Sequence, residues 1–446
     1  MYPKNESRSD YLYERACKVL PGGNSRHTVF FPPHPLYAVR GEGARVWDAD
    51  GTERLDLINN YSALIHGHNH PEIVEAIIHQ ARRLLSVAMP TEAEIELAEI
   101  VTSRLPGVDQ VRFANSGTEG VMMAVKAARA FTGRSKIAKI EGAYHGSADT
   151  AAISVNPDPK LWGDPDAPAS VAPAGVGPGA AADVVVLAMN EVEAGRAVLR
   201  AHAEDLAGVI VDPLMQTLGY ERASDAFLAM LREETTRTGA LLIFDEVYSF
   251  RLGFNGAQGA VGVTPELTAM GKVIGGGLPV GAVGGRADIM TDLFDPRSGR
   301  PRLAHGGTFN ANPMTMAAGA AAMRLFDRAA FDRLTTLGDR LRKGLMEAVK
   351  IAGVPATVKG ATSMTSLFHI EGPVRTYRDV QAAMRENPAA RERAERFFHY
   401  LLEHGVMIGA PGFFVLSTAL TDADIDRVCE TALAALRALE RAPALA

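Results

Sequence analysis

The chain has few cysteines, and they form no recognisable pattern. Its 446 residues include only Cys17 and Cys429, which lie near opposite ends. Two cysteines so far apart provide neither the spacing of a metal site nor a disulfide framework, and they fit a reducing compartment. Residues 1–6 are polar and lack the apolar core of a signal peptide. We therefore expect a cytoplasmic protein without a metal site.

The chain also lacks a basic excess and any long apolar run. It has 46 Lys and Arg against 52 Asp and Glu, a formal net charge of −6. Nucleic acids and anionic membrane surfaces attract proteins with the opposite imbalance. The apolar stretch 239–244 is far shorter than the roughly 20 residues of a membrane-spanning helix. We expect neither a nucleic-acid partner nor a membrane partner.

Apolar residues make up 47% of the chain, enough for a large core. Apolar stretches of strand length alternate with amphipathic helices, which predicts a mainly parallel sheet covered on both faces. Strands are expected over 111–113, 136–140, 183–187, 206–211 and 240–244, and helices over 118–131, 191–203 and 224–238. The predicted fold is α/β, with a large domain over 61–319. A smaller α+β domain is expected from the N-terminal segment 1–60 and the C-terminal part 320–446.

Other segments give weaker signals. Residues 1–40 contain Pro-Gly-Gly and Phe-Phe-Pro-Pro runs, which predict irregular structure. Segment 156–182 is rich in Pro, Gly and Ala, and predicts a long surface loop that is either near a functional site or a neutral insertion. Residues 358–370 and 413–420 predict strands, and 422–439 a closing helix.

Lys272 lies beside a glycine-rich turn, downstream of an apolar strand that ends in Asp245. Small apolar neighbours solvate an ammonium poorly, so the pKa of such a lysine falls and its amine can form a Schiff base with an aldehyde. A carboxylate at the end of a buried strand can keep a pyridine nitrogen protonated. This pair is what a pyridoxal phosphate (PLP) enzyme requires of its protein. Taken singly, Lys272 also fits an ordinary turn and Asp245 a helix cap.

Two turns have the residues of phosphate sites. Ser116, Gly117 and Thr118 lie between a predicted strand and a helix, where backbone N–H groups bind anions. The ordinary alternative is a helix N-cap with a capping-box character. Thr308 lies in a second polar turn before a helix, and it is a candidate phosphate donor or a cap.

Three further residues are candidate contacts of the cofactor ring. Tyr144 follows a predicted strand and can stack on a flat ring, with His145 beside it. Val247 follows Asp245 and can pack against the opposite face of the ring. Taken singly, Tyr144 fits better as a residue that covers the edge of the core. The order of these residues along the chain, together with Lys272 and the phosphate turns, is the order expected of a PLP site on a parallel sheet.

At these residues the chain resembles the class III aminotransferases, which are PLP enzymes of fold type I. It is most similar to the glutamate-1-semialdehyde aminomutase-like subgroup, which includes β-amino-acid (β-phenylalanine-type) aminotransferases. The similarity covers essentially the whole chain. It is carried by residues 21–26, 41–44, 67–71, 115–119, 141–146, 245–247, 271–285, 306–313 and 420–426.

The resemblance implies a role for each of these residues. Lys272 would be the Schiff-base lysine and Asp245 the partner of the pyridinium. The turn 116–118 would hold the phosphate, and Tyr144 would stack on the ring. Thr308 would reach the phosphate of the neighbouring subunit, which implies a homodimer with shared active sites.

The substrate side is less similar to the family. Arg26 matches a position that binds the substrate carboxylate in β-amino-acid enzymes, and a guanidinium suits that contact; a surface arginine is the alternative. Tyr61 is a second candidate. The β-phenylalanine enzymes carry an arginine where this chain has Pro411, and family members usually have Glu where it has Asp212. The substrate pocket is therefore expected to differ from the pockets of the β-phenylalanine enzymes and of the aminomutase.

We expect a PLP-dependent aminotransferase. It would move an amino group from an amino acid, including a β-amino acid, or from an amine to a 2-oxo acid in a ping-pong cycle. One alternative is a PLP-dependent isomerase, either a glutamate-1-semialdehyde 2,1-aminomutase or an amino-acid racemase. A second is a non-enzymatic or dinucleotide-binding α/β protein that uses the glycine-rich turn 275–277. The dinucleotide fingerprint does not follow the first strand, which disfavours the second alternative.

Overall fold

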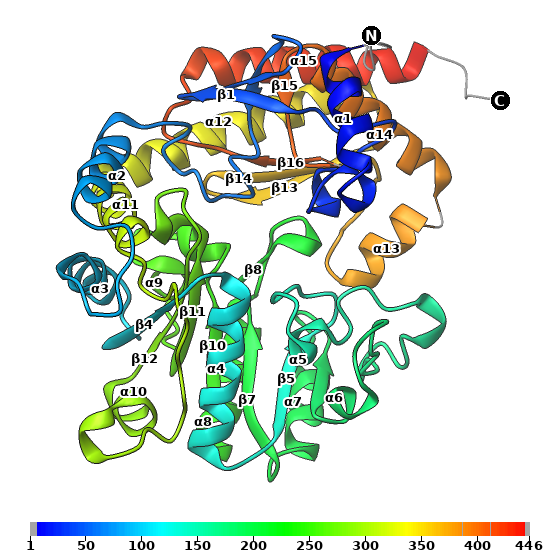
Figure 1. Cartoon of the computed structure of the whole chain (residues 1–446). Coiled ribbons are helices and arrows are strands. Elements are labelled where there is room, and N and C mark those ends of the chain that lie inside the picture. Colours follow the sequence, from blue (N-terminus) through cyan, green and yellow to red (C-terminus); the bar gives the residue numbers. More distant parts are fainter. Residues whose placement is uncertain (1–6, 386, 411, 442–446) are drawn as a thin grey trace.

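The computed structural model describes residues 7–385, 387–410 and 412–441. Its centre is a seven-stranded sheet with the order β4-β12-β11-β10-β7-β5-β6 (Figure 1). One strand, β12, runs opposite to the other six strands of this sheet, so the prediction of a mainly parallel sheet is confirmed. The strands are β4 (Gln110–Ala114), β5 (Lys136–Ile140), β6 (Val184–Leu187), β7 (Leu206–Val211), β10 (Leu241–Asp245), β11 (Leu267–Gly271) and β12 (Gly281–Gly285).

Helices cover both faces of this sheet because its strands are apolar on both sides. Along β10, Ile243 packs in a core with Val121 of α4, whereas Leu242 and Phe244 pack in another with Phe227 of α8. The covering helices are α4 (Gly117–Thr132) and α10 (Ala287–Phe294) on the first face, and α7 (Val192–Ala201) and α8 (Asp225–Thr238) on the second.

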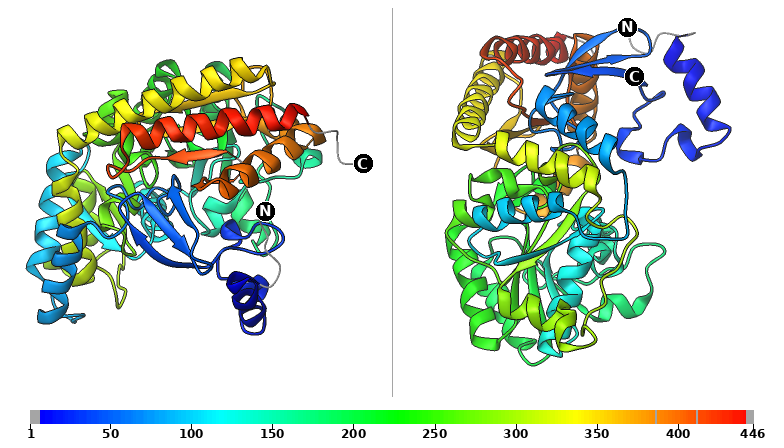
Figure 2. Two further views of the ribbon diagram at one scale, coloured as in Figure 1. Left: turned by 90° about the horizontal axis from the view of Figure 1, so that it is seen from above. Right: turned by 60° about the vertical axis from the view of Figure 1, so that its left-hand side comes forward.

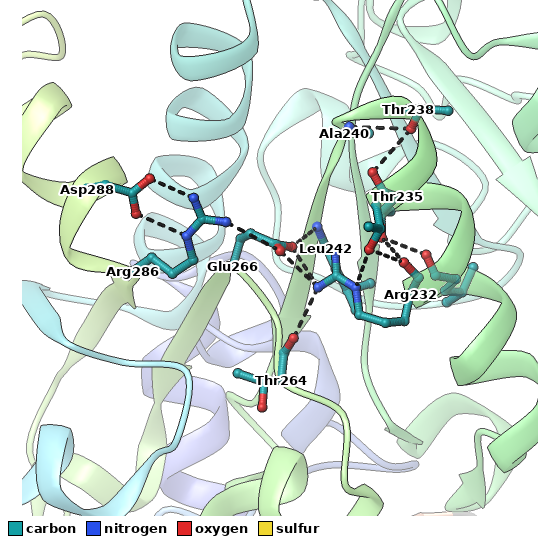
Figure 3. A network of polar contacts seen from close by, with 11 residues as sticks. Arg232, Thr235, Thr238, Ala240, Leu242, Thr264, Glu266, Arg286 and Asp288 are labelled. Atoms are coloured by element: carbon teal, nitrogen blue, oxygen red, sulfur yellow. Dashed lines mark hydrogen bonds and ion pairs between the residues drawn. The ribbon is translucent and has the colours of Figure 1, made fainter.

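A polar network fastens the amino ends of β10 and β11 (Figure 3). Glu266 accepts a 2.8 Å hydrogen bond from the backbone N–H of Leu242 and pairs with Arg232 at 2.9 Å. Arg286 lies 3.7 Å from Glu266 and forms a bidentate pair with Asp288. These charges stabilise the end of the sheet opposite to the carboxyl ends of the strands.

The N- and C-terminal parts of the chain build a second layer together. Strand β15 (Val406–Met407) pairs in parallel with β3 (Glu53–Asp56), which places both parts in one four-stranded sheet, β1-β2-β3-β15. Helices α12 (Arg328–Ala352), α14 (Pro388–Glu403) and α15 (Asp422–Arg441) lie side by side in this layer, and α14 contacts β15 (Figure 2). The other strands of the four-stranded sheet are β1 (Ala38–Glu42) and β2 (Arg45–Asp48). The same layer contains a three-stranded sheet made of β13 (Thr357–Ala361), β14 (Met364–Phe368) and β16 (Phe413–Val415).

Three helices connect the two layers: α2 (Pro71–Arg83), α3 (Glu92–Arg104) and α11 (Pro313–Leu325). Ile73 of α2 packs in one cluster with Ala318 and Ala322 of α11. The other elements are short: α5 (Asp149–Ala152), α6 (Pro178–Ala182), β8 (Leu214–Met215), β9 (Glu221–Arg222), α9 (Gly256–Val261) and α13 (Tyr377–Arg385).

Three local predictions are wrong. The expected irregular N-terminal segment contains α1 (Arg8–Cys17), whose first N–H groups are capped by Ser7 and by the carboxylate of Asp50. The strand expected over 358–370 is a hairpin, because Thr362 adopts a positive φ of 46° between β13 and β14. The strand expected over 413–420 ends at Val415.

The prediction of a long loop over 156–182 is confirmed. Segment 156–182 is mainly loop, with one short 3-10 turn and the helix α6. Both cysteines are free thiols. In the part of the chain that the structure describes, no helix is long and apolar enough to cross a membrane, and no cluster of three metal-ligating side chains occurs.

Candidate active site

A cavity of about 400 Å³ lies at the carboxyl ends of the parallel strands. This is where open α/β sheets bind their ligands, because the loops that leave neighbouring strands converge there. The residues after β4, β5, β7 and β11 and the last residue of β10 all reach it. The cavity brings together Arg26, Tyr61, Ser116, Gly117, Thr118, Tyr144, His145, Asp245, Val247 and Lys272.

The first predicted phosphate turn is the N-terminus of α4. Ser116 is the N-cap, and its Oγ accepts a hydrogen bond from the N–H of Glu119 at 3.2 Å. The Glu119 carboxylate accepts in return from the N–H of Asn115 at 2.6 Å. The interpretation of Ser116 as a helix N-cap is therefore correct. It is compatible with an anion site, because α4 directs its first N–H groups and its positive dipole end at the cavity.

Asp245 is held from two sides at the end of β10. Its Oδ1 accepts from the backbone N–H of Val247 at 3.0 Å, and its Oδ2 lies 2.7 Å from Nδ1 of His145. The alternative role of a helix cap belongs to the next residue, Glu246, which accepts from the N–H groups of Ala257 and Gln258 in α9. Asp245 itself remains at the cavity wall.

Lys272 follows β11 and adopts a positive φ of 48°, which is uncommon for a residue with a side chain. Burial lowers the pKa of its amine, although the nearby carboxylates of Asp245 and Asp212 oppose this effect. Its Nζ lies 4.8 Å from the centre of the Tyr248 ring. The amine thus faces the same cavity as the phosphate turn and the Asp245 carboxylate.

The family of the chain follows from its sequence. Residues 30–436 match the pattern of the class III aminotransferases. The chain belongs to this family. Its resemblance to these enzymes, and the PLP-dependent α/β fold that they share, are confirmed.

The relatives of this aminotransferase include aminomutases and transaminases. It is 39% identical over 440 residues to a glutamate-1-semialdehyde 2,1-aminomutase 2 of Brevibacillus brevis, which covers 97% of this chain and 99% of the relative. It is 40% identical over 420 residues to the β-phenylalanine transaminase of Variovorax paradoxus, and the match covers 94% of this chain and 90% of that transaminase. The structure of an omega-transaminase from Sphaerobacter thermophilus matches with a TM-score of 0.95 and 46% identity, and the match covers 98% of this chain and 99% of that enzyme.

The family is PLP-dependent, and a transaminase with PLP bound is 41% identical to this chain. The cavity residues of this aminotransferase fit the cofactor. A Cβ on Gly117 would stand 2.7 Å from Cγ1 of Val247, so only glycine allows this close approach beside the phosphate turn. Tyr144 lines the cavity and is 60% exposed, which leaves it available for stacking.

Thr308 is the one predicted cofactor residue that does not line the cavity. It is exposed, in the segment that leads to α11, next to the exposed Phe309. Thr308 therefore lies outside the cavity formed by its own chain.

The sequence alone assigns no role to Asp212 or Tyr248, although both line the cavity of the aminotransferase. Asp212 is buried, and both burial and the Asp245 charge raise its pKa well above the usual range. Tyr248 contacts the phenol of Tyr220 at 3.2 Å, and burial raises the pKa of Tyr248 to about 12. The signal that could have found them is position: Asp212 directly follows β7, and Tyr248 is three residues beyond Asp245.

The candidate substrate residues lie on the N-terminal part of the chain. An Arg26 N–H donates to Oδ1 of Asn60 at 2.8 Å, and the Tyr61 hydroxyl donates to the carbonyl of Thr28 at 2.7 Å. Arg26 is exposed and so remains open to a charged ligand. Pro411, where the sequence departs from the β-phenylalanine enzymes, is outside the described residues.

Proposed function

We propose that this aminotransferase takes the amino group of an amino acid, including a β-amino acid, or of an amine and transfers it to a 2-oxo acid. The observation that carries the proposal is the single cavity that joins the Lys272 amine, the Asp245 carboxylate and the N-terminus of α4. Bound PLP supplies an electron sink for the carbon that carries the amino group. Every other task belongs to side chains of this protein.

Each side chain has a role that its position supports. Lys272 attaches the cofactor and, once free, moves a proton to and from the reacting carbon. Asp245 holds the proton on the cofactor ring nitrogen, and His145 orients Asp245. Residues 116–118 bind the phosphate, and Tyr144 and Val247 enclose the ring. The lowered pKa of the Lys272 amine favours its neutral form, which is the form that accepts a proton.

The second candidate function is an isomerase that moves the amino group within one molecule, because a relative of 39% identity is an aminomutase. The match of 46% identity to an omega-transaminase favours the transaminase. The residues that surround PLP serve both reactions, so the substrates must distinguish them.

A donor and acceptor panel tests the function. The purified enzyme is given α-amino acids, β-amino acids and simple amines, each with pyruvate, with 2-oxoglutarate and without acceptor. We expect a keto product only when an acceptor is present, in a one-to-one ratio with the aminated acceptor. Turnover of an amino substrate to its isomer without any acceptor would establish the isomerase instead.

The proposed assembly is a homodimer in which Thr308 of each subunit reaches the phosphate site of the other. Its exposed position outside its own cavity supports this arrangement. Exposed apolar side chains also gather on the segments that the Asn312–Leu85 hydrogen bond joins, and such patches mark interaction surfaces. They are Leu85, Met89 and Phe309.

Phe309→Arg tests this interface, since a charge in a buried apolar contact disfavours association. We expect a shift toward the monomer in analytical ultracentrifugation and weaker PLP binding. Ile351→Arg, at an exposed apolar residue of α12, is the matched control and leaves the mass unchanged. A dimer of unchanged stability in the Phe309 variant would place the interface elsewhere.

We also propose the division into a large domain over 61–319 and a small domain from 1–60 and 320–446. The pairing of β3 with β15 supports it, because this pairing joins the two ends of the chain. The free cysteines support a cytoplasmic location.

A further inference from the structure

Lys139 is a buried lysine whose amine has no anionic partner on the residues that the structure describes. It lies on β5, its residue is 1% exposed, and burial lowers the pKa of its amine to about 7. Its Nζ donates to three backbone carbonyls: those of Ala143 at 2.9 Å, Ala151 at 3.0 Å and Ile153 at 2.5 Å. Lysine is almost never buried in this way, because the desolvation of its charge is costly.

The three carbonyls belong to one closed loop, residues 141–154. The loop leaves the end of β5 and returns to it, and the N–H of Gly142 donates to the carbonyl of Ser154 at 2.8 Å across its base. Lys139 fills the space inside the loop and binds both of its arms. Ala143 lies on the outgoing arm, and Ala151 and Ile153 lie on the returning arm.

The tip of this loop carries three residues of the active-site cavity. Tyr144 and His145 directly follow the Ala143 carbonyl that Lys139 binds, and His145 reaches Asp245 at 2.7 Å. Gly146 packs so closely on Thr118 that a Cβ there would stand 2.5 Å from its Oγ1. The position of this tip thus determines where Tyr144 lies in the cavity, where His145 meets Asp245, and where Gly146 contacts Thr118.

Helix α13 clamps the base of the same loop from outside. Arg378 forms a bidentate pair with Glu141 at 2.9 and 3.0 Å, and also donates to the carbonyl of Trp162 at 2.8 Å. The Tyr377 hydroxyl donates to Asn156 at 2.7 Å. The outer clamp fixes the base of the loop and leaves its interior to Lys139.

We propose that Lys139 is a positioning residue for the cofactor: its ammonium holds the loop 141–154 in the shape that places Tyr144 and His145. The proposal rests on the proposed roles of these two residues. Lys139 itself does not line the cavity and takes no part in proton transfer. An ammonium suits this task because it has three donors and no acceptor, which matches three converging carbonyls.

Lys139→Met keeps most of the unbranched side chain and removes the donors. The matched control is Lys136→Met, on the same strand. Lys136 pairs with Asp205 at a distance of 2.8 Å, and neither residue lines the cavity. Three quantities are measured on the full-length proteins. They are the PLP dissociation constant, the visible circular dichroism of bound PLP, and hydrogen–deuterium exchange of residues 141–154 in the apo protein.

For Lys139→Met we expect PLP affinity at least tenfold weaker, an altered dichroic band and faster exchange confined to the loop. The control should match the wild type in all three. Wild-type PLP affinity and dichroism in Lys139→Met would overturn the proposal, even if the protein were less stable. If Lys139→Met does not fold, Lys139→Gln decides, because its shorter amide supplies fewer donors to the loop. It should bind PLP at least threefold more weakly, and wild-type affinity there overturns the proposal.

Wild-type protein that binds no PLP would instead refute the assigned function. The two failures are therefore distinguishable, because only the second affects the unmodified enzyme.

Discussion

Nδ1 of His145 lies 2.7 Å from Oδ2 of Asp245, and both side chains are buried. The bond crosses the end of β7, because His145 follows β5 and Asp245 ends β10, and β7 lies between these strands. The other carboxylate oxygen accepts from the N–H of Val247. Both oxygens are therefore oriented before a cofactor arrives, which reduces the reorganisation that binding requires.

Removing the imidazole tests this orientation. A hydrogen bond to a charged group contributes about 1.5–3 kcal/mol, or about ten- to a hundredfold in rate. We expect His145→Leu to lower kcat by about that factor. His145→Asn should retain most of the activity, because its amide nitrogen can replace Nδ1 as the donor. Equal losses in both variants would show that the imidazole does more than orient Asp245.

Lys272→Ala removes both the attachment point and the proton carrier. We expect kcat to fall at least about a hundredfold, the lower range for loss of a general acid–base group. After borohydride reduction and digestion, mass spectrometry should find the PLP adduct on the Lys272 peptide of the wild type and on no peptide of the variant. Lys160→Ala, an exposed lysine on the 156–182 loop, is the control and should be labelled at Lys272. An adduct on another residue of the wild type would refute the assignment.

The sequence predicted the sheet and most of the cavity for one physical reason. Polar turns that follow successive buried strands must meet at one edge when the strands are parallel. Asn115, Tyr144, Asp245 and Lys272 are each placed by that rule. The family resemblance then assigned roles that spacing alone left open.

The rest depended on contacts between segments far apart in the sequence. Helix α1 has no apolar stripe, and its start is fixed by Asp50, which lies about forty residues away. Lys139 had the appearance of an ordinary strand lysine, because its carbonyl partners converge only after the loop 141–154 has closed. In the sequence Asp212 is only a departure from the family, because its burial near Asp245 arises from the tertiary fold.

Arg26→Ala should distinguish donors by their charge. If the guanidinium binds a substrate carboxylate, KM for carboxylated donors rises about ten- to a hundredfold, and KM for simple amines is unchanged. Arg26→Lys keeps the charge but loses the planar fork, so an intermediate KM is expected. Steady-state kinetics with one donor of each class measure this. Equal effects on both classes would show that Arg26 supports the loop near Asn60 and does not bind substrate.

His369 should make the enzyme less stable in acid. The residue is 3% exposed, neither ring nitrogen has a hydrogen-bond partner among the described residues, and the ring packs edge-on against Phe397 at 5.2 Å. Burial, and then the charge of Arg393, lower its pKa to about 3. An unfolded histidine has a pKa of about 6.5, so between the two values the unfolded state binds the extra proton. Stability from this group is complete above about pH 6.5 and is lost as the pH falls.

His369→Phe removes this dependence and keeps the packing against Phe397. At pH 7.5 the variant should be at least as stable as the wild type, because it buries no unpaired nitrogen. Below pH 6.5 the difference should widen in favour of the variant, and the slope should approach about 1.4 kcal/mol per pH unit toward pH 5. Differential scanning calorimetry of both holoenzymes across this range measures the gap in Tm. Parallel curves for the two proteins would mean that His369 either keeps its ordinary pKa in the folded state or is solvated there.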